Sequence, residues 1–171
     1  MLIEPIRCWP VEQAQILIEP VDFDAPSAQG VMSLAADELD RRYGPATDTH
    51  PFDAASFSPP RGTFLIARVD GHVAGGVGLR DVGDRHAEIK RLWVRPDLRR
   101  SGVGRALMDA AVEAGRELGV RTLILETGPL QPEAVALYRA HGWTEVEQLP
   151  VKVSDYPDAV RFVNELSLPQ R

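Results

Sequence analysis

One short segment constrains this chain more than any other. Residues 99–105 read Arg-Arg-Ser-Gly-Val-Gly-Arg and lie between an expected strand, Ala87–Val94, and an expected helix that begins near Gly102. The first turn of a helix leaves several backbone N–H groups without intrahelical partners, and the helix dipole adds partial positive charge there. Glycines let an oxyanion approach these N–H groups closely, and arginines add charge and forked donors. The segment therefore predicts a pyrophosphate-binding loop. A loop of solvated arginines is the alternative that the residues alone leave open.

The strand before this loop carries an irregularity. Its apolar residues stop alternating around Lys90-Arg91, since Ile89 holds an odd position and Leu92 and Val94 hold even ones. A β-bulge beside these charges turns all three apolar side chains to one face. Because bulges also splay neighbouring strands, we expect an opening in the sheet that admits a flat, extended ligand arm.

The surrounding elements indicate a mixed α/β fold. Gly102–Leu118 carries one apolar stripe at helical spacing and is followed by Gly119, and Arg121–Thr127 has the pattern of a buried strand. Strand, helix and strand within about 40 residues predict a right-handed βαβ unit with parallel strands. The other expected strands are Ala14–Val21, Thr63–Val69, His72–Arg80, Trp143–Glu147 and Val160–Leu166, and the other expected helices are Ala25–Tyr43 and Gln131–Ala140. Together they predict one mixed sheet with helices on both faces.

Three details of these elements are open to a direct check. The first helix is expected to begin at an Asp24 cap and to bury Val31, Leu34, Ala35 and Leu39. The glycines of residues 75–78 lie inside a strand with no helix after them, which favours close backbone approach or a bulge over a nucleotide loop. Residues 44–62 hold four prolines and predict a long irregular connection. Such loops are often functional, and this one could shape a substrate entrance together with the first helix.

Composition restricts the class of partner. The chain has 171 residues, 44% of them hydrophobic and 26% charged, which is typical of one soluble globular domain. We assign residues 14–171 to that domain and residues 1–13 to a leader of uncertain order. The net charge of −6 argues against a nucleic-acid binder, so the cluster of arginines at residues 91–105 favours a small anionic ligand. No secretory signal and no apolar run of about 18 residues is present, which predicts a cytoplasmic protein without a membrane partner.

Cysteine, histidine and serine chemistry receives no support from the sequence. The single cysteine, Cys8, excludes an internal disulfide, and the four histidines show no metal-ligand spacing, so no metal is expected. His141 lies at the end of a predicted helix, where an imidazolium would interact favourably with the helix dipole. Ser101 lacks the Gly-x-Ser-x-Gly elbow of a serine nucleophile.

Two motifs in this order resemble those of the GNAT superfamily of N-acetyltransferases. Arg-x-x-Gly-x-Gly at Arg99, Gly102 and Gly104, after the strand Ala-Glu-Ile-Lys-Arg-Leu-Trp-Val, is similar to the coenzyme A motif of that superfamily. Residues 131–143, Gln-Pro-Glu-Ala-Val-Ala-Leu-Tyr-Arg-Ala-His-Gly-Trp, resemble its second signature, a helix ending in Leu-Tyr and followed by Gly-aromatic. The similarity is strong over residues 88–143 and extends more loosely, in strand and helix order, over residues 14–166. It implies the GNAT fold and acetyl-CoA as the acyl donor.

The resemblance implies three groups of cofactor-binding residues. The loop residues Arg99, Arg100, Ser101, Gly102, Val103, Gly104 and Arg105 would hold the phosphates. The backbone groups of Leu92, Trp93 and Val94 would pair with the pantetheine amides as an added strand does. Gln131 stands where the superfamily often has Asn, and its amide can still hydrogen-bond the cofactor.

Three residues are candidates for proton transfer. The resemblance makes Tyr138 the candidate acid, because a phenol with a pKa of about 10 can hydrogen-bond a leaving thiolate. Without the resemblance, a tyrosine on a helix would be interpreted as part of the hydrophobic core or of its rim. Glu88 stands eleven residues before Arg99, as a glutamate does in several superfamily members, and is the candidate base. The residues alone leave it as a strand carboxylate paired with Lys90 or Arg91. Glu126, at the carboxyl end of a predicted parallel strand, is the second candidate, as base or as a binder of the substrate amine.

The sequence therefore predicts an acetyl-CoA-dependent N-acetyltransferase whose acceptor amine attacks directly in a ternary complex. Cys8 lies far from both motifs, so an acyl-cysteine step has no support. The expected acceptor is a small-molecule amine or the N-terminal or lysine amine of a protein, and the expected assembly is a monomer or homodimer. Two alternatives from other classes are a sensor that binds acyl-CoA without turnover and a module that binds another nucleotide.

Overall fold

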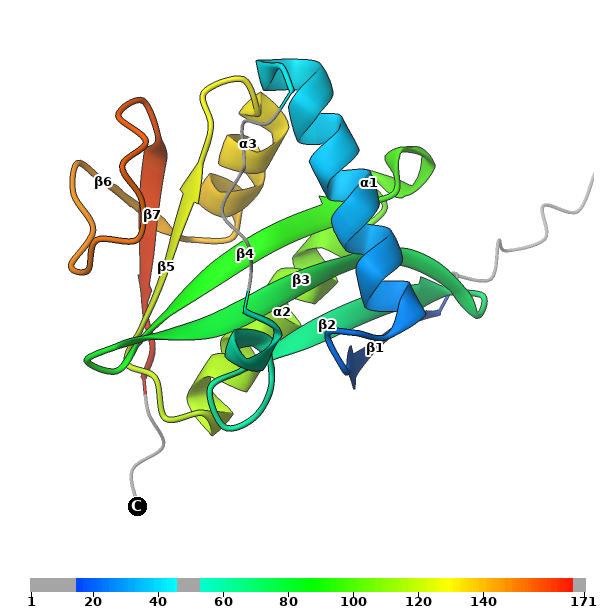
Figure 1. The fold of residues 1–171 in the computed structure, drawn as a ribbon, viewed down its shortest axis with the longest axis horizontal. Helices are drawn as coiled ribbons and strands as arrows, with labels where there is room; N and C mark the ends of the chain where they lie inside the picture. The colour runs from blue at the N-terminus through cyan, green and yellow to red at the C-terminus, as the bar shows by residue number, and fades with distance from the viewer. Residues whose placement is uncertain (1–14, 46–52, 168–171) are drawn as a thin grey trace, which may run out of the picture.

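The fold is a single mixed sheet with helices around it. The structure is a computed structural model that describes residues 15–45 and 53–167, and its strands pair in the order β1-β2-β3-β4-β5-β7-β6 (Figure 1). The strands are β1 (Ile16–Val21), β2 (Gly62–Val69), β3 (His72–Gly83), β4 (His86–Val94), β5 (Thr122–Thr127), β6 (Thr144–Val146) and β7 (Val160–Glu165); the helices are α1 (Pro26–Tyr43), α2 (Val103–Glu117) and α3 (Pro132–Ala140), and η1 (Ala54–Phe57) and η2 (Pro96–Leu98) are 3₁₀ turns. The expected mixed sheet is confirmed. The expected leader 1–13, with Cys8, and residues 46–52 of the long connection lie outside the described residues.

The sheet opens between β4 and β5. These strands run parallel and are joined by α2, as expected, but they pair at only three positions, from His86–Thr122 to Glu88–Ile124. Beyond Glu88 they diverge (Figure 1), while β4 stays paired with β3 as far as Val94. The edge of β4 that faces β5 is therefore open from Lys90 to Val94.

The predicted β-bulge lies at the start of this open edge. β4 advances three residues, from Lys90 to Trp93, where β3 advances two, and Arg91 has a positive φ of 57°. As a result Leu92 and Val94 pack against the same core as Ile89. Trp93 turns its side chain to the opposite face of the sheet.

Helices cover both faces of the sheet. α2 and α3 pack over the larger core on one face, and α1 and η1 pack on the other around Phe57 and Phe64. On α1, Val31 and Ala35 are buried as expected, but the expectation for Leu34 is wrong, since its side chain is largely exposed. The buried stripe follows small residues at positions 28, 31 and 35, and Leu34 lies on its flank.

The start of α1 also differs from the expectation. Asp24 is not the N-cap: the helix begins at Pro26 after Ala25, and no side chain caps it. Proline suits the first helical position because its missing N–H is one that the helix leaves without a partner, and its fixed φ favours entry into the helix.

The glycine-rich part of β3 makes room for aromatic side chains. A Cβ atom built on Gly78 would lie 2.6 Å from Cε1 of Phe57, and one on Gly76 would lie 3.2 Å from Cε1 of Phe64. The register of β3 against β4 shifts between the same two glycines. Both findings confirm close approach and a bulge, as expected for a strand rather than a nucleotide loop.

Candidate active site

A cavity of about 710 Å³ lies where β4 and β5 diverge. Its walls come from α1, the open part of β4, the loop before α2, the end of β5 and one side of α3. Of the residues predicted for the site, it is lined by Leu92, Trp93, Val94, Arg99, Arg100, Gly102, Gly104, Arg105, Glu126, Gln131 and Tyr138. Glu88, Ser101 and Val103 are not among the lining residues. The expected contribution of α1 is confirmed by Ala35, Glu38 and Leu39, whereas the described part of the 44–62 connection does not line the cavity.

The loop before α2 has the backbone geometry of an anion cradle. Arg100 and Gly102 adopt positive φ angles of 62° and 96°, and Gly102 is the N-cap of α2, with no side-chain cap. The first helical bond runs from Ala106 N to Gly102 O, so the N–H groups of the first turn have no partner within the helix. Among the described residues other than its chain neighbours, a Cβ on Gly102 would come within 4 Å of Cδ1 of Ile16 alone, at 3.9 Å. An oxyanion can therefore come close to this helix end.

The arginines of this loop fall into two groups. Arg99 folds back: its Nε donates to Val94 O at 3.0 Å, and its Nη2 donates to Oε2 of Glu38 at 2.5 Å. Arg100 and Arg105 are exposed at the mouth of the cavity. The positive charge that an anionic ligand meets first therefore comes from Arg100 and Arg105, while Arg99 holds the loop against β4.

The open edge of β4 presents alternate backbone groups. Arg95 N donates to Ala74 O on β3, and because backbone groups alternate between the two edges of a strand, those of Trp93 also face β3. Leu92 and Val94 then direct their N–H and C=O groups toward the gap. Of the three predicted backbone contacts, these two are the ones that an extended arm in the gap can reach.

Tyr138 projects from α3 into the cavity through an aromatic cluster. Its side chain is buried, with ring centroids 6.2 Å from Trp143 and 5.5 Å from Phe162. Burial raises the pKa of the Tyr138 hydroxyl well above its ordinary value of 10.0. The Tyr138 side chain is therefore a protonated phenol at neutral pH, not a phenolate.

His141 supports this cluster from the end of α3. Nδ1 of His141 accepts a hydrogen bond from the Trp143 indole at 3.2 Å, so the ring proton lies on Nε2, which contacts Asp109 on α2 at 2.7 Å. An indole N–H can only donate, so Nδ1 is the acceptor of the Trp143 contact. The favourable interaction of a His141 imidazolium with the helix dipole stays a prediction.

The two candidate carboxylates have different surroundings. Glu88 is fully buried, with Oε2 at 2.7 Å from Nη2 of Arg80 and Oε1 at 3.2 Å from Nζ of Lys90. Glu126 lies at the cavity wall, where Oε1 accepts from Nε of Arg161 at 3.0 Å and Oε2 accepts from the Ser154 hydroxyl. Both are held by arginine, but only Glu126 borders the space in which an acceptor would bind.

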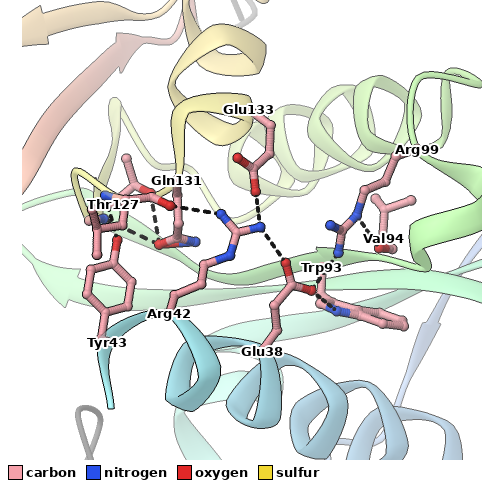
Figure 2. Close-up of polar contacts among 11 residues, drawn as sticks. Glu38, Arg42, Tyr43, Trp93, Val94, Arg99, Thr127, Gln131 and Glu133 are labelled. Carbon is pink, nitrogen blue, oxygen red and sulfur yellow. Dashed lines mark hydrogen bonds and ion pairs between the residues drawn. The ribbon is translucent and has the colours of Figure 1, made fainter.

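Gln131 lies at the turn between β5 and α3. Its Oε1 accepts from Oγ1 of Thr127 at 3.3 Å and from Gly128 N at 3.4 Å (Figure 2). These contacts orient the side chain by its carbonyl, which leaves the amide NH₂ as the group toward a ligand in the cavity.

Sequence reasoning missed a group of charged residues that crosses the cavity. Glu38 and Arg42 of α1 contact each other at 2.7 Å, and Arg42 also pairs with Glu133 of α3 (Figure 2). Burial acts to raise the pKa of Glu38, but its bonds to Arg99, Trp93 and Arg42 outweigh burial and hold that pKa below the ordinary value. The spacing of four residues between Glu38 and Arg42 is a signal for an ion pair on a helix. No local signal indicates the contacts to α3 and to Arg99.

Residues 15–45 and 53–167 contain neither a cluster of metal ligands nor a helix that could span a membrane. These residues include no group of three or more His, Cys, Asp or Glu side chains placed to hold a metal ion. None of the helices formed by them has the length and apolarity to cross a bilayer.

Comparison with known proteins identifies the class. Residues 29–143 match the model of the acetyltransferase (GNAT) family, and the chain belongs to this family of acyltransferase enzymes. It is 35% identical over 126 residues to the IAA acetyltransferase of Azospirillum brasilense, covering 71% of this chain and 82% of the relative.

Solved structures show the same fold. A GNAT family acetyltransferase from Staphylococcus aureus superimposes with a TM-score of 0.75 at 16% identity, covering 88% of this chain and 100% of the other. A GNAT family acetyltransferase from Elizabethkingia anophelis with acetyl-CoA bound gives a TM-score of 0.64 at 17% identity, covering 88% and 98%. GNAT acetyltransferases transfer acetyl groups to amines of small molecules or proteins.

Proposed function

We propose that this protein is an N-acetyltransferase that moves the acetyl group of acetyl-CoA to a primary amine by direct attack in a ternary complex. The observation that carries the proposal is the continuity of one cavity. It joins the anion cradle at the start of α2, the open edge of β4, Tyr138 and Glu126. A cofactor bound along this path would bring its thioester close to Tyr138 and Glu126, the two side chains that can donate or accept a proton.

The cofactor end of the cavity fits the chemistry of coenzyme A. The pyrophosphate would accept hydrogen bonds from the N–H groups at the first turn of α2 and face the charges of Arg100 and Arg105. The pantetheine amides would pair with the backbone of Leu92 and Val94, as an added strand pairs with a sheet edge. The open space beside Gly102 supports this assignment, because the phosphates need close contact with backbone.

In the transfer step, the amine nitrogen bonds to the thioester carbon, the carbon–sulfur bond breaks, and the ammonium proton must leave. Tyr138 would hydrogen-bond the departing sulfur and supply its proton. Burial raises the pKa of this hydroxyl further above that of a thiol, so full proton transfer is uphill and the main contribution is the hydrogen bond that strengthens as charge develops on the sulfur.

We assign the amine to Glu126 in preference to Glu88. Glu126 borders the cavity and has the geometry to bind the acceptor ammonium or to take its proton through a water. Glu88 is fully buried between Arg80 and Lys90 and does not line the cavity. A base role for Glu88 would require a water chain to the cavity.

An activity screen against a panel of amines tests the proposal and identifies the class of acceptor. Relatives at about 30% identity include a mycothiol acetyltransferase from Mycolicibacterium vanbaalenii and a ribosomal protein alanine N-acetyltransferase from Bacillus subtilis, so the panel should hold both small amines and peptides. We expect acetyl-CoA-dependent thiol release with at least one amine, and a product 42 Da heavier (about one acetyl group) by mass spectrometry. Tight CoA binding without thiol release across the panel would instead support a sensor, and displacement of CoA by ATP would support a nucleotide-binding module.

A further inference from the structure

One carboxylate on α1 contacts two other walls of the cavity and a second residue of its own helix. Oε2 of Glu38 accepts from the indole Nε1 of Trp93 at 3.0 Å and from Nη2 of Arg99 at 2.5 Å, and its Oε1 accepts from Nη2 of Arg42 at 2.7 Å (Figure 2). Its side chain is only 17% exposed. All four residues are directed toward the space between α1, β4 and α3 (Figure 2); the Arg42 contact is made along α1, whereas those to Trp93 and Arg99 connect α1 to β4 and to the loop before α2.

Arg99 transmits the position of Glu38 to the phosphate loop. The guanidinium donates at once to Glu38 and to the carbonyl of Val94, the last residue of β4. The fork geometry of arginine allows both bonds from one rigid plane. The loop that begins at Arg99 is therefore fixed relative to the open strand edge by a contact made on the α1 side of the sheet.

Arg42 extends the same connection to α3. It pairs with Glu133, and its Nη1 donates to Leu130 O at 2.9 Å; the neighbouring Tyr43 hydroxyl accepts from Leu130 N at 3.0 Å (Figure 2). The hydroxyl end of Tyr43 lies against Gly128, where a Cβ would come to 2.0 Å from the tyrosine oxygen. The end of α1 is thus attached to the turn that carries Gln131 and leads into the Tyr138 helix.

The cluster of Glu38, Glu133, Arg42 and Arg99 is balanced in charge. Two carboxylates face two guanidiniums, so the charge of Arg99 is already compensated within the protein. If Arg99 acted only by attracting phosphate, this compensation would weaken it. The arrangement suits a residue that sets geometry instead.

We propose that Glu38 is a positioning residue for acetyl-CoA. By holding Arg99 and Trp93 on one side and Arg42 on the other, it fixes the distance between the phosphate loop, the open edge of β4 and α3, which are the three walls against which the cofactor would lie. This inference rests on the proposed function only in naming CoA as the ligand, since it concerns binding and not transfer.

The test is the affinity for CoA, measured by calorimetry and therefore independent of any acceptor. We expect Glu38→Gln to weaken CoA about tenfold, equivalent to about 1.4 kcal/mol, while kcat at saturating acetyl-CoA changes less than about threefold. Glu19→Gln is the matched control, because it removes a half-buried glutamate–arginine pair, Glu19–Arg68 at 2.6 Å, remote from the cavity. It should leave CoA affinity unchanged. Unchanged affinity in folded Glu38→Gln, or an equal loss in both variants, would overturn the proposal.

A second variant keeps the test decisive if Glu38→Gln folds poorly. Arg99→Lys preserves the charge but replaces the rigid fork that bonds Val94 and Glu38 with a single flexible ammonium, so a positioning role predicts a similar loss of CoA affinity, and the double variant with Glu38→Gln should lose little more. Near-normal binding by Arg99→Lys would show that charge alone matters and would contradict the proposal. Failure of the wild-type protein to bind CoA would contradict the proposed function instead.

Discussion

The two ends of the cavity are built in different ways. At the cofactor end, the binding groups lie in one continuous segment, residues 99–105, and most of them are backbone N–H groups placed by a helix start. Near Glu126, where we propose that the acceptor binds, the groups are side chains brought together over long distances, as Glu126 and Arg161 are, 35 residues apart. A ligand at the cradle would meet local backbone geometry, whereas an acceptor at Glu126 would meet groups that only tertiary contacts bring together.

The largest expected effect tests the chemistry between the two ends. Tyr138→Phe keeps the ring packed against Trp143 and Phe162 but removes the proton for the leaving sulfur. Turnover should fall roughly 10²–10⁴-fold with nearly unchanged CoA affinity, as measured by thiol release and calorimetry. Tyr156→Phe, at an exposed tyrosine in the β6–β7 connection, is the control and should keep full turnover. A fully active Tyr138→Phe would leave the sulfur to be protonated by water.

The pH profile gives a second view of Tyr138. Burial raises the pKa of its hydroxyl above the ordinary 10.0, so the acid form persists to higher pH than that of a free tyrosine. Wild-type turnover at saturating substrates should therefore show no alkaline decline below about pH 10. A descending limb centred near pH 8–9 that disappears in Tyr138→Phe would contradict the assignment.

The next effect separates the two candidate carboxylates. Glu126→Gln should lower kcat/KM about 10²-fold at neutral pH, and the loss should shrink as the pH approaches the amine pKa of about 10.4. Glu88→Gln should mainly lower the melting temperature, because Arg80 and Lys90 lose their shared counter-ion in a buried place. Rescue by high pH in Glu88→Gln but not in Glu126→Gln would transfer the base role to Glu88.

A smaller effect tests the cradle. A Cβ on Gly104 would lie 3.3 Å from Cδ2 of Leu137, so Gly104→Val requires that side chain to shift by a few tenths of an ångström and narrows the cavity that Gly104 lines. We expect CoA to bind about tenfold more weakly by calorimetry. Gly30→Val adds the same side chain to an exposed helical glycine with nothing within 4 Å of the new Cβ, and should bind CoA normally. Equal affinities in both variants would remove the cradle hypothesis.

The smallest effect distinguishes the arginines. Arg100→Ala and Arg105→Ala should each weaken CoA up to about fivefold at low salt, because both side chains are exposed, and this effect should vanish as salt screens the charges. The loss in Arg99→Ala should persist at high salt, since Arg99 holds Val94 and Glu38. Parallel salt dependence of affinity titrations in all three variants would mean that Arg99 also acts by charge.

The order of elements and the cofactor end could be predicted because their signals are local. The slip in alternation at Lys90-Arg91 indicated the bulge, and the glycines at 102 and 104 indicated the helix start. The position of Leu34 could not be predicted, because the buried stripe of α1 depends on which side faces the sheet. The contact of His141 with Asp109, 32 residues away, is non-local. The partners of Glu38 are equally non-local.

The short pairing of β4 with β5 leaves unpaired strand edge inside a sheet, and such edges invite association with strands of other chains. Here α1 and α3 line the gap from both faces, with the Arg42–Glu133 pair between them. A polypeptide strand carries side chains on both faces, and these would clash with the two helices. A thin amide-bearing chain without side chains would not clash. The same narrowness that admits a ligand arm thus guards the protein against aggregation through its own unfinished sheet, and a bound arm would complete that sheet.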